Sequence, residues 1–215
     1  MMQSKPSLAT AFRLVLPLLV ISAISAVALA KKPPPPKKGA ERYYLKVVAV
    51  EYEDGVKAQA LEPMVREKFI AQLAGRPEFL TSLEGAPDPK ADPDAFGKWA
   101  EKKKIRAFDV RIKFVKYQRT LAPIQGSNDQ MLSVNVEVQL LGANVPLETL
   151  GMTGTGTGTV SAQVGKTVTP KIEEDVHAQA VDGALKNAFD EATRQLRAFK
   201  PTQAPRAKPA AKPKK

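Results

Sequence analysis

Several short stretches contain residue types that bind phosphates, so their spacing decides whether such chemistry follows. Gly165-Lys166-Thr167 matches the end of a phosphate-binding loop, but that motif needs a glycine where this chain has Val160. Gly154, Gly156 and Gly158 are spaced too closely for a dinucleotide-binding fingerprint, which needs two residues before its last glycine. The sequence therefore predicts no nucleotide cofactor.

Metal and acid–base chemistry are constrained by a single histidine, His177, and by the absence of cysteine. A His-rich metal site and a thiol nucleophile are excluded, and a serine triad would have to use His177. We expect His177 to lie at the surface or boundary of a helix. The acidic residues cluster in turns and at a helix N-terminus, where capping accounts for them. We expect no catalytic residue, no metal and no enzymatic activity; a cell-wall hydrolase is the least favoured alternative.

A glycine–threonine stretch, residues 151–160, is the most unusual segment of the chain. Because side chains alternate along a strand, its threonines would share one face and Gly154, Gly156 and Gly158 the other. Glycines normally weaken a strand, so this pattern indicates that something approaches the backbone closely. The approaching group is either a helix of the same chain or an outside partner.

A long helix after this stretch offers the internal partner. Thr169-Pro170 provides an N-cap followed by proline at the first helical position. Alanine recurs at every fourth position, which gives the helix a smooth ridge: Ala180, Ala184, Ala188 and Ala192. We favour close packing of this ridge on the three glycines, which makes those glycines structural.

The elements before the glycine–threonine stretch follow from hydrophobic periodicity. Residues 43–52 and 77–81 predict strands, the second of them weak, and residues 61–73 and 93–104 predict helices. Clean alternation predicts two long antiparallel strands, residues 107–117 and 132–140. We therefore expect one α/β (α+β) domain over residues 41–199. Its mixed, largely antiparallel sheet has about five strands and is packed by three helices, the last of them long and C-terminal.

The N-terminus has the features of a secretory signal, residues 1–30. Lys5 and Arg13 precede an apolar run, residues 14–29, which ends in the cleavage pattern Ala28-Leu29-Ala30. We expect cleavage after Ala30 and a periplasmic or secreted protein. The alternative is an uncleaved helix that anchors the chain in the inner membrane, since lysines directly after the apolar run oppose translocation.

Positive charge is concentrated at the two ends of the chain. The formal net charge is +11, but all 22 acidic residues lie between 39 and 199, where 21 basic residues nearly balance them. The basic Pro-rich linker, residues 31–40, and the tail, residues 200–215, cannot build a core, so we expect them to be disordered. They either contact an anionic membrane or cell-wall surface or serve as solubilising ends.

The densest basic run within the domain is a candidate interaction face for an acidic partner. It comprises Lys102, Lys103, Lys104, Arg106, Arg111 and Lys113. The alternative is that this run is the solvated side of a helix and a strand. We expect no nucleic-acid partner, because the chain carries an export signal and lacks interleaved aromatic residues.

The order of elements resembles a group of bacterial periplasmic domains. Residues 43–199 are similar to the curli-secretion lipoproteins, to the lipoprotein activators of penicillin-binding proteins and to the N-terminal domain of TolB. The resemblance rests on the helix 64–73, on the segment 100–114, and on the strand 134–140 followed by the glycine–threonine strand and the last helix. Two departures are the lack of a lipobox cysteine and the turn 142–146, where many members carry a Thr-Gly pair.

The resemblance implies non-enzymatic work in the cell envelope. Our leading hypothesis is an exported protein that binds or scaffolds other periplasmic or outer-membrane components, including an envelope protein partner. The first alternative is a binder of anionic surfaces or cell-wall polymer that acts through its basic ends. The identity of the partner, the oligomeric state and the strand order are left open by the sequence.

Overall fold

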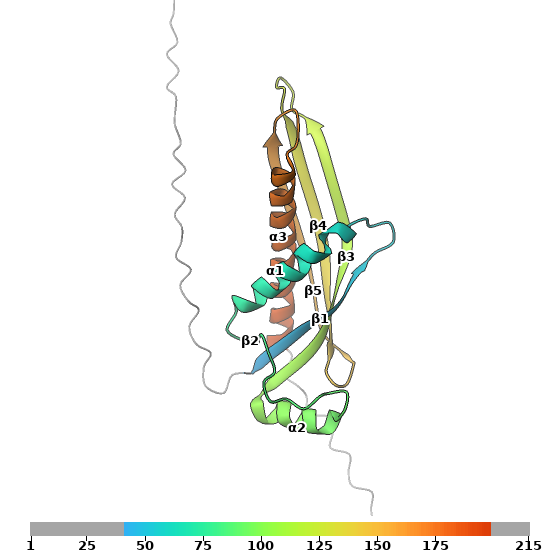
Figure 1. Ribbon diagram of the computed structural model, residues 1–215, viewed down its shortest axis with the longest axis vertical. Coiled ribbons are helices and arrows are strands. Elements are labelled where there is room, and N and C mark those ends of the chain that lie inside the picture. Colours follow the sequence, from blue (N-terminus) through green and yellow to red (C-terminus); the bar gives the residue numbers. More distant parts are fainter. Residues whose placement is uncertain (1–40, 199–215) are drawn as a thin grey trace, which may run out of the picture. The chain divides into compact units, whose positions relative to one another are not determined.

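A computed structural model describes residues 41–198; the expected signal, the Pro-rich linker and the C-terminal tail fall outside the described residues. The described chain runs through five strands, three α-helices and one 3-10 turn (Figure 1). In chain order they are β1 (Arg42–Tyr52), η1 (Gln59–Leu61), α1 (Glu62–Ala74), β2 (Phe79–Leu80), α2 (Pro93–Lys103), β3 (Ile105–Pro123), β4 (Gln130–Asn144), β5 (Leu150–Val164) and α3 (Pro170–Ala198). The predicted mixed α/β architecture with a long C-terminal helix is confirmed.

The strands form one mixed sheet in the order β2-β1-β3-β4-β5. β1 runs parallel to both of its neighbours, and β3, β4 and β5 pair antiparallel. Parallel neighbours need a crossover connection: α1 lies in the connection between β1 and β2, and the connection between β1 and β3 contains α1, β2 and α2. β5 is therefore one edge strand, and the two-residue β2 is the other.

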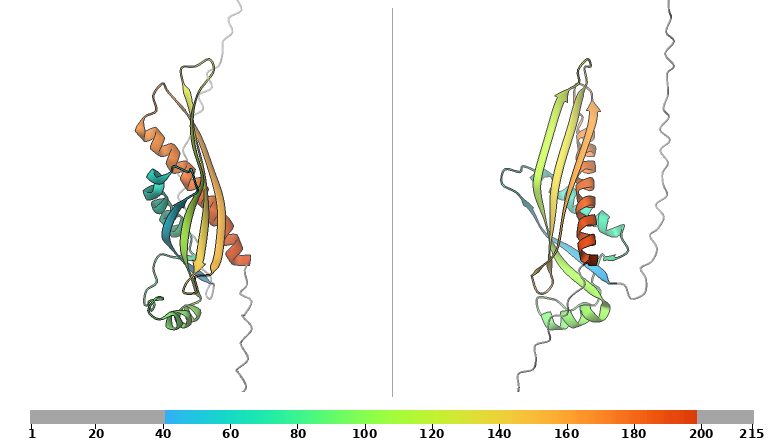
Figure 2. Two further views of the ribbon diagram at one scale, coloured as in Figure 1. Left: turned by 90° about the vertical axis from the view of Figure 1, so that its right-hand side faces the viewer. Right: turned by 180° about the vertical axis from the view of Figure 1, so that it is seen from behind.

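One face of the sheet is buried under α1 and α3, which lie on the same side of it (Figure 2). Alternate residues of β3 and β4 point into this core, as their alternating pattern predicts. They are Phe108, Val110, Ile112 and Phe114 on β3, and Leu132, Val134, Val136, Val138 and Leu140 on β4. From the helices, Phe69 and Phe189 meet with their ring centroids 4.7 Å apart.

The other face is polar along most of its length, and we call it the open face. β5 contributes its threonines there, and β4 contributes Asn135, Glu137 and Gln139. Only at the end where β1 and β3 begin does this face carry a second, smaller cluster, in which Phe96 and Ala100 of α2 pack on Ala107. α2 begins as predicted, because the Asp92 carboxylate accepts the N–H of Ala95 at 2.9 Å.

α3 packs on β5 at backbone distance, and the three glycines make this approach sterically allowed. A β-carbon at Gly154, Gly156 or Gly158 would overlap a backbone carbonyl oxygen of the alanine ridge. The carbonyls belong to Ala188, Ala184 and Ala180, respectively. Two residues of a strand advance about 6.7 Å and four residues of a helix about 6.0 Å. Because these steps are nearly equal, every second residue of β5 meets every fourth residue of α3. The close packing that we favoured from the sequence is present.

Polar side chains of α3 also satisfy the free edge of β5. The Asn187 amide donates to the Thr157 carbonyl oxygen at 2.8 Å, and the Glu191 carboxylate accepts the N–H of Thr155 at 2.8 Å. One turn on, the Thr153 hydroxyl donates to Gln195 at 2.9 Å. Edge backbone groups that would otherwise pair with another chain are thereby occupied.

Candidate binding site at the end of the sheet

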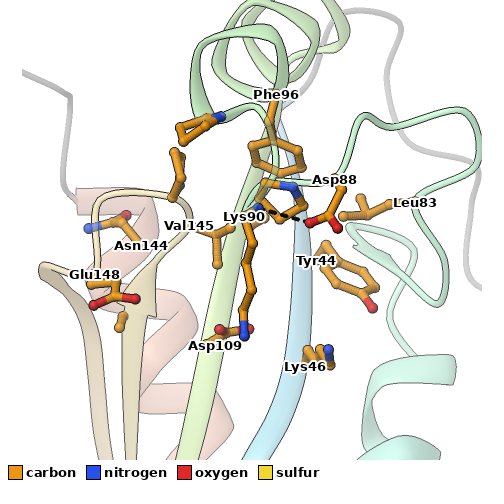
Figure 3. A pocket seen from close by; sticks show the side chains of 15 residues that line it. Tyr44, Lys46, Leu83, Asp88, Lys90, Phe96, Asp109, Asn144, Val145 and Glu148 are labelled. Carbon is orange, nitrogen blue, oxygen red and sulfur yellow. Dashed lines mark hydrogen bonds between the residues drawn. The ribbon is translucent and has the colours of Figure 1, made fainter.

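A large cavity lies on the open face, at the end where β1 and β3 begin. Its volume is about 810 Å³. Four separate segments enclose it: β1, the loop that precedes α2 together with α2 itself, β3, and the turn between β4 and β5. Its apolar floor includes Leu83, Phe96 and Val145, and Tyr44 lies beside them (Figure 3). We call this cavity the end pocket.

The end pocket carries charged groups of both signs. Lys46 and Lys90 supply two ammonium groups, and Asp88, Asp109 and Glu148 supply three carboxyl groups. The Asp88 carboxylate accepts the backbone N–H of Lys90 at 2.8 Å, and the Lys90 side chain extends toward Asp109 (Figure 3). Such a mixed lining provides hydrogen-bond donors and acceptors of both charges, which suits recognition of a polar, mixed-charge surface.

The turn between β4 and β5, residues 145–149, forms one wall of the end pocket and is tied to the sheet. The Val145 N–H donates to the Ala107 carbonyl at 2.9 Å, and the Asn144 amide donates to the Thr149 carbonyl at 3.0 Å. Gly151 leaves room for that amide, because a β-carbon there would overlap the Asn144 side chain. The first glycine of the glycine–threonine stretch therefore shapes this turn and does not pack on α3.

Two leucines project from this turn region into solvent. Leu147 is 74% exposed and Leu150 is 64% exposed, although both are large and apolar. The β4 and β5 side chains on the core face further along are buried or partly buried, so this exposure belongs to the turn end of the strand pair. Exposed apolar side chains that are rimmed by polar groups are found at protein–protein interaction surfaces.

The structure does not bring the six residues of the predicted basic face together. Lys102 and Lys103 lie in the last turn of α2, and Lys104 ends that helix in the left-handed conformation. Arg106 lies on the core side of β3, with its guanidinium 5.2 Å from the centroid of the Phe108 ring. Strand alternation thus separates Arg106 from the open-face positions that follow it.

Arg111 and Lys113 do share the open face, but acidic residues at the end of β1 lie close to both of them. Arg111 lies 3.8 Å from the Glu51 carboxylate. Lys113 forms a hydrogen-bonded ion pair with Glu53, and this hydrogen bond raises the pKa of Lys113. These two cations are therefore balanced locally and do not form a basic surface.

His177 is buried, so the expectation of a surface or boundary position was wrong. Only 7% of it is exposed, and its Nε2 lies 2.8 Å from the Tyr117 hydroxyl. Its Nδ1 lies 2.7 Å from the Glu173 carbonyl oxygen, which can only accept, so Nδ1 carries a proton. Burial raises the pKa of the Tyr117 hydroxyl. The pair bridges β3 and α3 inside the domain and is not part of the end pocket.

Within residues 41–198, no group of three or more His, Cys, Asp or Glu side chains is placed to hold a metal ion. In the same range, no helix has the length and apolar character needed to cross a membrane. The end pocket was missed from the sequence because its walls come from segments up to about 100 positions apart. The one local signal was the pair of leucines next to Glu148 and Thr149, Leu147 and Leu150.

The sequence matches no protein-family model, and no curated protein matches it. The solved structures that are similar at low identity include the following three. A neuraminyllactose-binding hemagglutinin homolog from Helicobacter pylori has 12% identity and a TM-score of 0.44, over 78% of this chain and 90% of that one. A minor lipoprotein from Acinetobacter baumannii has 13% identity and a TM-score of 0.35, over 72% and 90%. A lipoprotein from Caulobacter crescentus has 14% identity and a TM-score of 0.38, over 70% and 92%.

Proposed function

We propose that this protein is an exported, non-enzymatic binding protein of the cell envelope, and that it contacts its protein partner through the end pocket and the turn beside it. The observation that supports this most is the combination of a mixed-charge cavity with two exposed leucines on a hydrogen-bonded turn. Apolar anchors surrounded by polar groups concentrate binding energy in known interfaces. Export rests on the signal sequence.

The lining of the end pocket supports binding more than catalysis. The single histidine is not among its lining residues, and the chain has no cysteine. The Asp88 carboxylate already accepts a backbone hydrogen bond within its own loop. The lysines and carboxylates therefore serve as recognition groups for a charged partner surface.

Site-specific photo-crosslinking in the native envelope tests this proposal. A photoreactive residue in place of Leu147 should give one discrete crosslinked product, whereas the same residue in place of Leu121, which is 40% exposed on β3, should not. Lys90→Glu, which reverses one charge in the pocket, should reduce the yield at least about tenfold, equal to about 1.4 kcal/mol. Equal products at both positions would contradict the proposal. So would hydrolysis of cell-wall polymer that a single change at Asp88, Asp109 or Glu148 abolishes.

The basic ends favour a second candidate function, attachment to an anionic surface. Residues 31–40 and 200–215 contain ten lysines or arginines and no acid. A protein without both ends should lose binding to vesicles that contain anionic lipid, and the intact protein should lose it in high salt, because screening weakens exposed charges. Vesicle binding that survives both changes would rule out this function for the ends.

A further inference from the structure

The sheet edge formed by β2 and β1 is mostly open. β2 pairs with β1 at only two positions, Tyr43 with Phe79 and Tyr44 with Leu80. After Leu80 the chain leaves the sheet toward α2, whereas β1 continues to Tyr52. Within the described residues, the remainder of β1 has only β3 as a strand partner. The strand position that β2 begins to fill is therefore empty beside Leu45 and the residues after it. We call this empty strand position the vacant lane.

Backbone groups of β1 point into this vacant lane. The Arg42 N–H donates toward β3, to Lys104, whereas the Tyr43 N–H donates the other way, to Glu78 just before β2. Because these directions alternate along a strand, the N–H and C=O groups of Leu45 and Val47 also point away from β3. Two residues thus offer two donors and two acceptors to a further strand.

A cavity of about 300 Å³ occupies the same lane, and α1 covers it. β1 lines it with Leu45 and Val47, and β2 lines it with Leu80. From α1, Phe69, Ile70 and Leu73 contribute apolar surface, and Ile70 is 61% exposed despite its size. The space is bounded by a strand edge on one side and by a helix above, which is the geometry of a short β-strand site. We call it the β1 groove.

The β1 groove fits a single extended segment better than a second copy of this chain. Antiparallel pairing of two β1 edges in one continuous sheet would bring the α1 helices of both copies over the same two strands. The chain's own ends are unsuited too, because they are rich in proline, which cannot donate to a strand ladder. They also carry lysines, and Lys46 lines the groove; Arg66 lines it too but is paired with the Glu62 carboxylate at 2.8 Å.

We propose that the β1 groove binds an extended, acidic peptide segment of another protein, which adds as a strand beside Leu45 and Val47. Side chains on one face of the added strand fill the apolar space under Ile70 and Leu73. An acidic side chain on its other face meets Lys46, since the lining residues include no carboxylate. Tyr44 and Lys46 line both the β1 groove and the end pocket, but the groove does not include the turn of Leu147 and Leu150. Its argument, which rests on the open edge of β1, does not depend on the proposed function.

A peptide titration tests the inference. It uses the full protein purified from the cells that produce and process it. The probe is an eight-residue peptide with valine at every second position and glutamate or threonine between. One control peptide has lysine in place of glutamate, and a second is N-methylated at alternate amides, which removes donors from one edge of the strand. Two-dimensional amide NMR should show saturable shifts at Leu45 and Val47 with the acidic probe. Both controls should bind at least about tenfold more weakly, equal to about 1.4 kcal/mol.

Two substitutions and a matched control complete the design. Ile70→Ser should weaken the acidic probe at least about fivefold, and Lys46→Glu should reverse the preference between glutamate and lysine peptides. Leu121→Ser, an exposed leucine on β3 outside the groove, should leave binding unchanged. Equal binding of the N-methylated peptide, shifts confined to the end pocket, or no binding at millimolar probe would overturn the proposal. Concentration-dependent shifts at Leu45 without any peptide would overturn it in favour of a second copy.

Discussion

The two edges of this sheet are built in opposite ways. At the β5 edge, α3 lies against the glycines at backbone distance, and Asn187 and Glu191 satisfy the outward backbone groups of Thr157 and Thr155. At the β1 edge, β2 pairs with two residues and then leaves, and a cavity replaces the missing strand. α3 closes the β5 edge, whereas α1 covers a strand position beside β1 that holds no strand.

The difference shows how one sheet can be protected and accessible at once. An unpaired edge is normally an aggregation hazard, and the β5 edge removes that hazard with a helix. The β1 edge limits it differently, because the open stretch is short, lies under α1 and has Lys46 beside it. We infer that the closed edge gives the domain its stability and that the open side, with the end pocket next to it, is available for partners.

The largest expected effect comes from breaking the closed edge with Gly156→Val. A β-carbon at this position overlaps the Ala184 carbonyl and the backbone of Ala188, so the helix has to move away from the strand. We expect a loss of about 3 kcal/mol or more in the free energy of unfolding, measured by urea denaturation. Gly97→Ala in α2 is the matched control: it meets no atom within 4 Å and should stabilise by about 0.5–1 kcal/mol. A Gly156→Val protein as stable as the unchanged one would refute close packing as the role of this glycine.

Removing the polar side chains of α3 that bond to the β5 edge should have a smaller effect on stability. Asn187→Ala and Glu191→Ala each delete one hydrogen bond to β5, and each should cost about 1 kcal/mol. The double variant should also self-associate in sedimentation velocity, because its edge becomes free to pair. Arg194→Ala, an exposed change on the same helix, should do neither. If the double variant stays monomeric at high concentration, the capping side chains do not protect this edge.

The ion pair between Arg76 and Asp190 links the end of α1 to α3, and it should make a small, pH-dependent contribution. Burial acts to raise the pKa of Asp190, but hydrogen bonds from Arg76 and Lys186 lower it below its ordinary value. Because the folded-state pKa is lowered, the stabilisation is present above the unfolded pKa and is lost as the pH falls through the folded one. Asp190 is half exposed, so we expect less than about 1 kcal/mol. Denaturation between pH 2 and 7 should show that the free energy of unfolding falls less steeply with acid for Asp190→Asn. An identical decline would show that Asp190 does not contribute to the pH dependence of stability.

The open end should tolerate substitution with almost no change in stability. Leu147→Ser combined with Leu150→Ser should alter the free energy of unfolding by less than about 0.5 kcal/mol, because both side chains are mostly in solvent. Leu150→Ser in the protein that carries the photoreactive residue at position 147 should reduce the envelope crosslink, whereas Leu121→Ser in that protein should retain it. A large loss of stability would mean that these leucines support the fold, which would weaken the contrast between the two regions.

Local patterns predicted much of this fold. Alternating apolar residues correctly located β3 and β4, and Thr169-Pro170 correctly located the start of α3. The glycine and alanine spacings predicted their mutual packing, because strand and helix advance by nearly equal steps over two and four residues. Each of these signals lies within one element, so it can be found without knowing the topology.

Features that depend on topology were not predicted. Tyr44, Asp88, Asp109 and Asn144 meet in the end pocket only because β1 and β3 are neighbours and α2 returns to their shared end. The six basic residues looked continuous in sequence, but strand alternation placed Arg106 on the opposite side from Arg111. His177 is buried because Tyr117, 60 positions earlier, provides its partner.

Residue-resolved hydrogen exchange by NMR in the free protein tests the contrast between the two edges most directly. The account predicts that the Thr155 amide, which Glu191 accepts at the closed edge, exchanges at least about tenfold more slowly than the amides of Leu45 and Val47 in the β1 groove. Glu191→Ala should accelerate Thr155 and leave Leu45 unchanged. Fast exchange at Thr155 together with strong protection of Leu45 and Val47 would contradict the account, because the edge that we describe as open would then be the closed one.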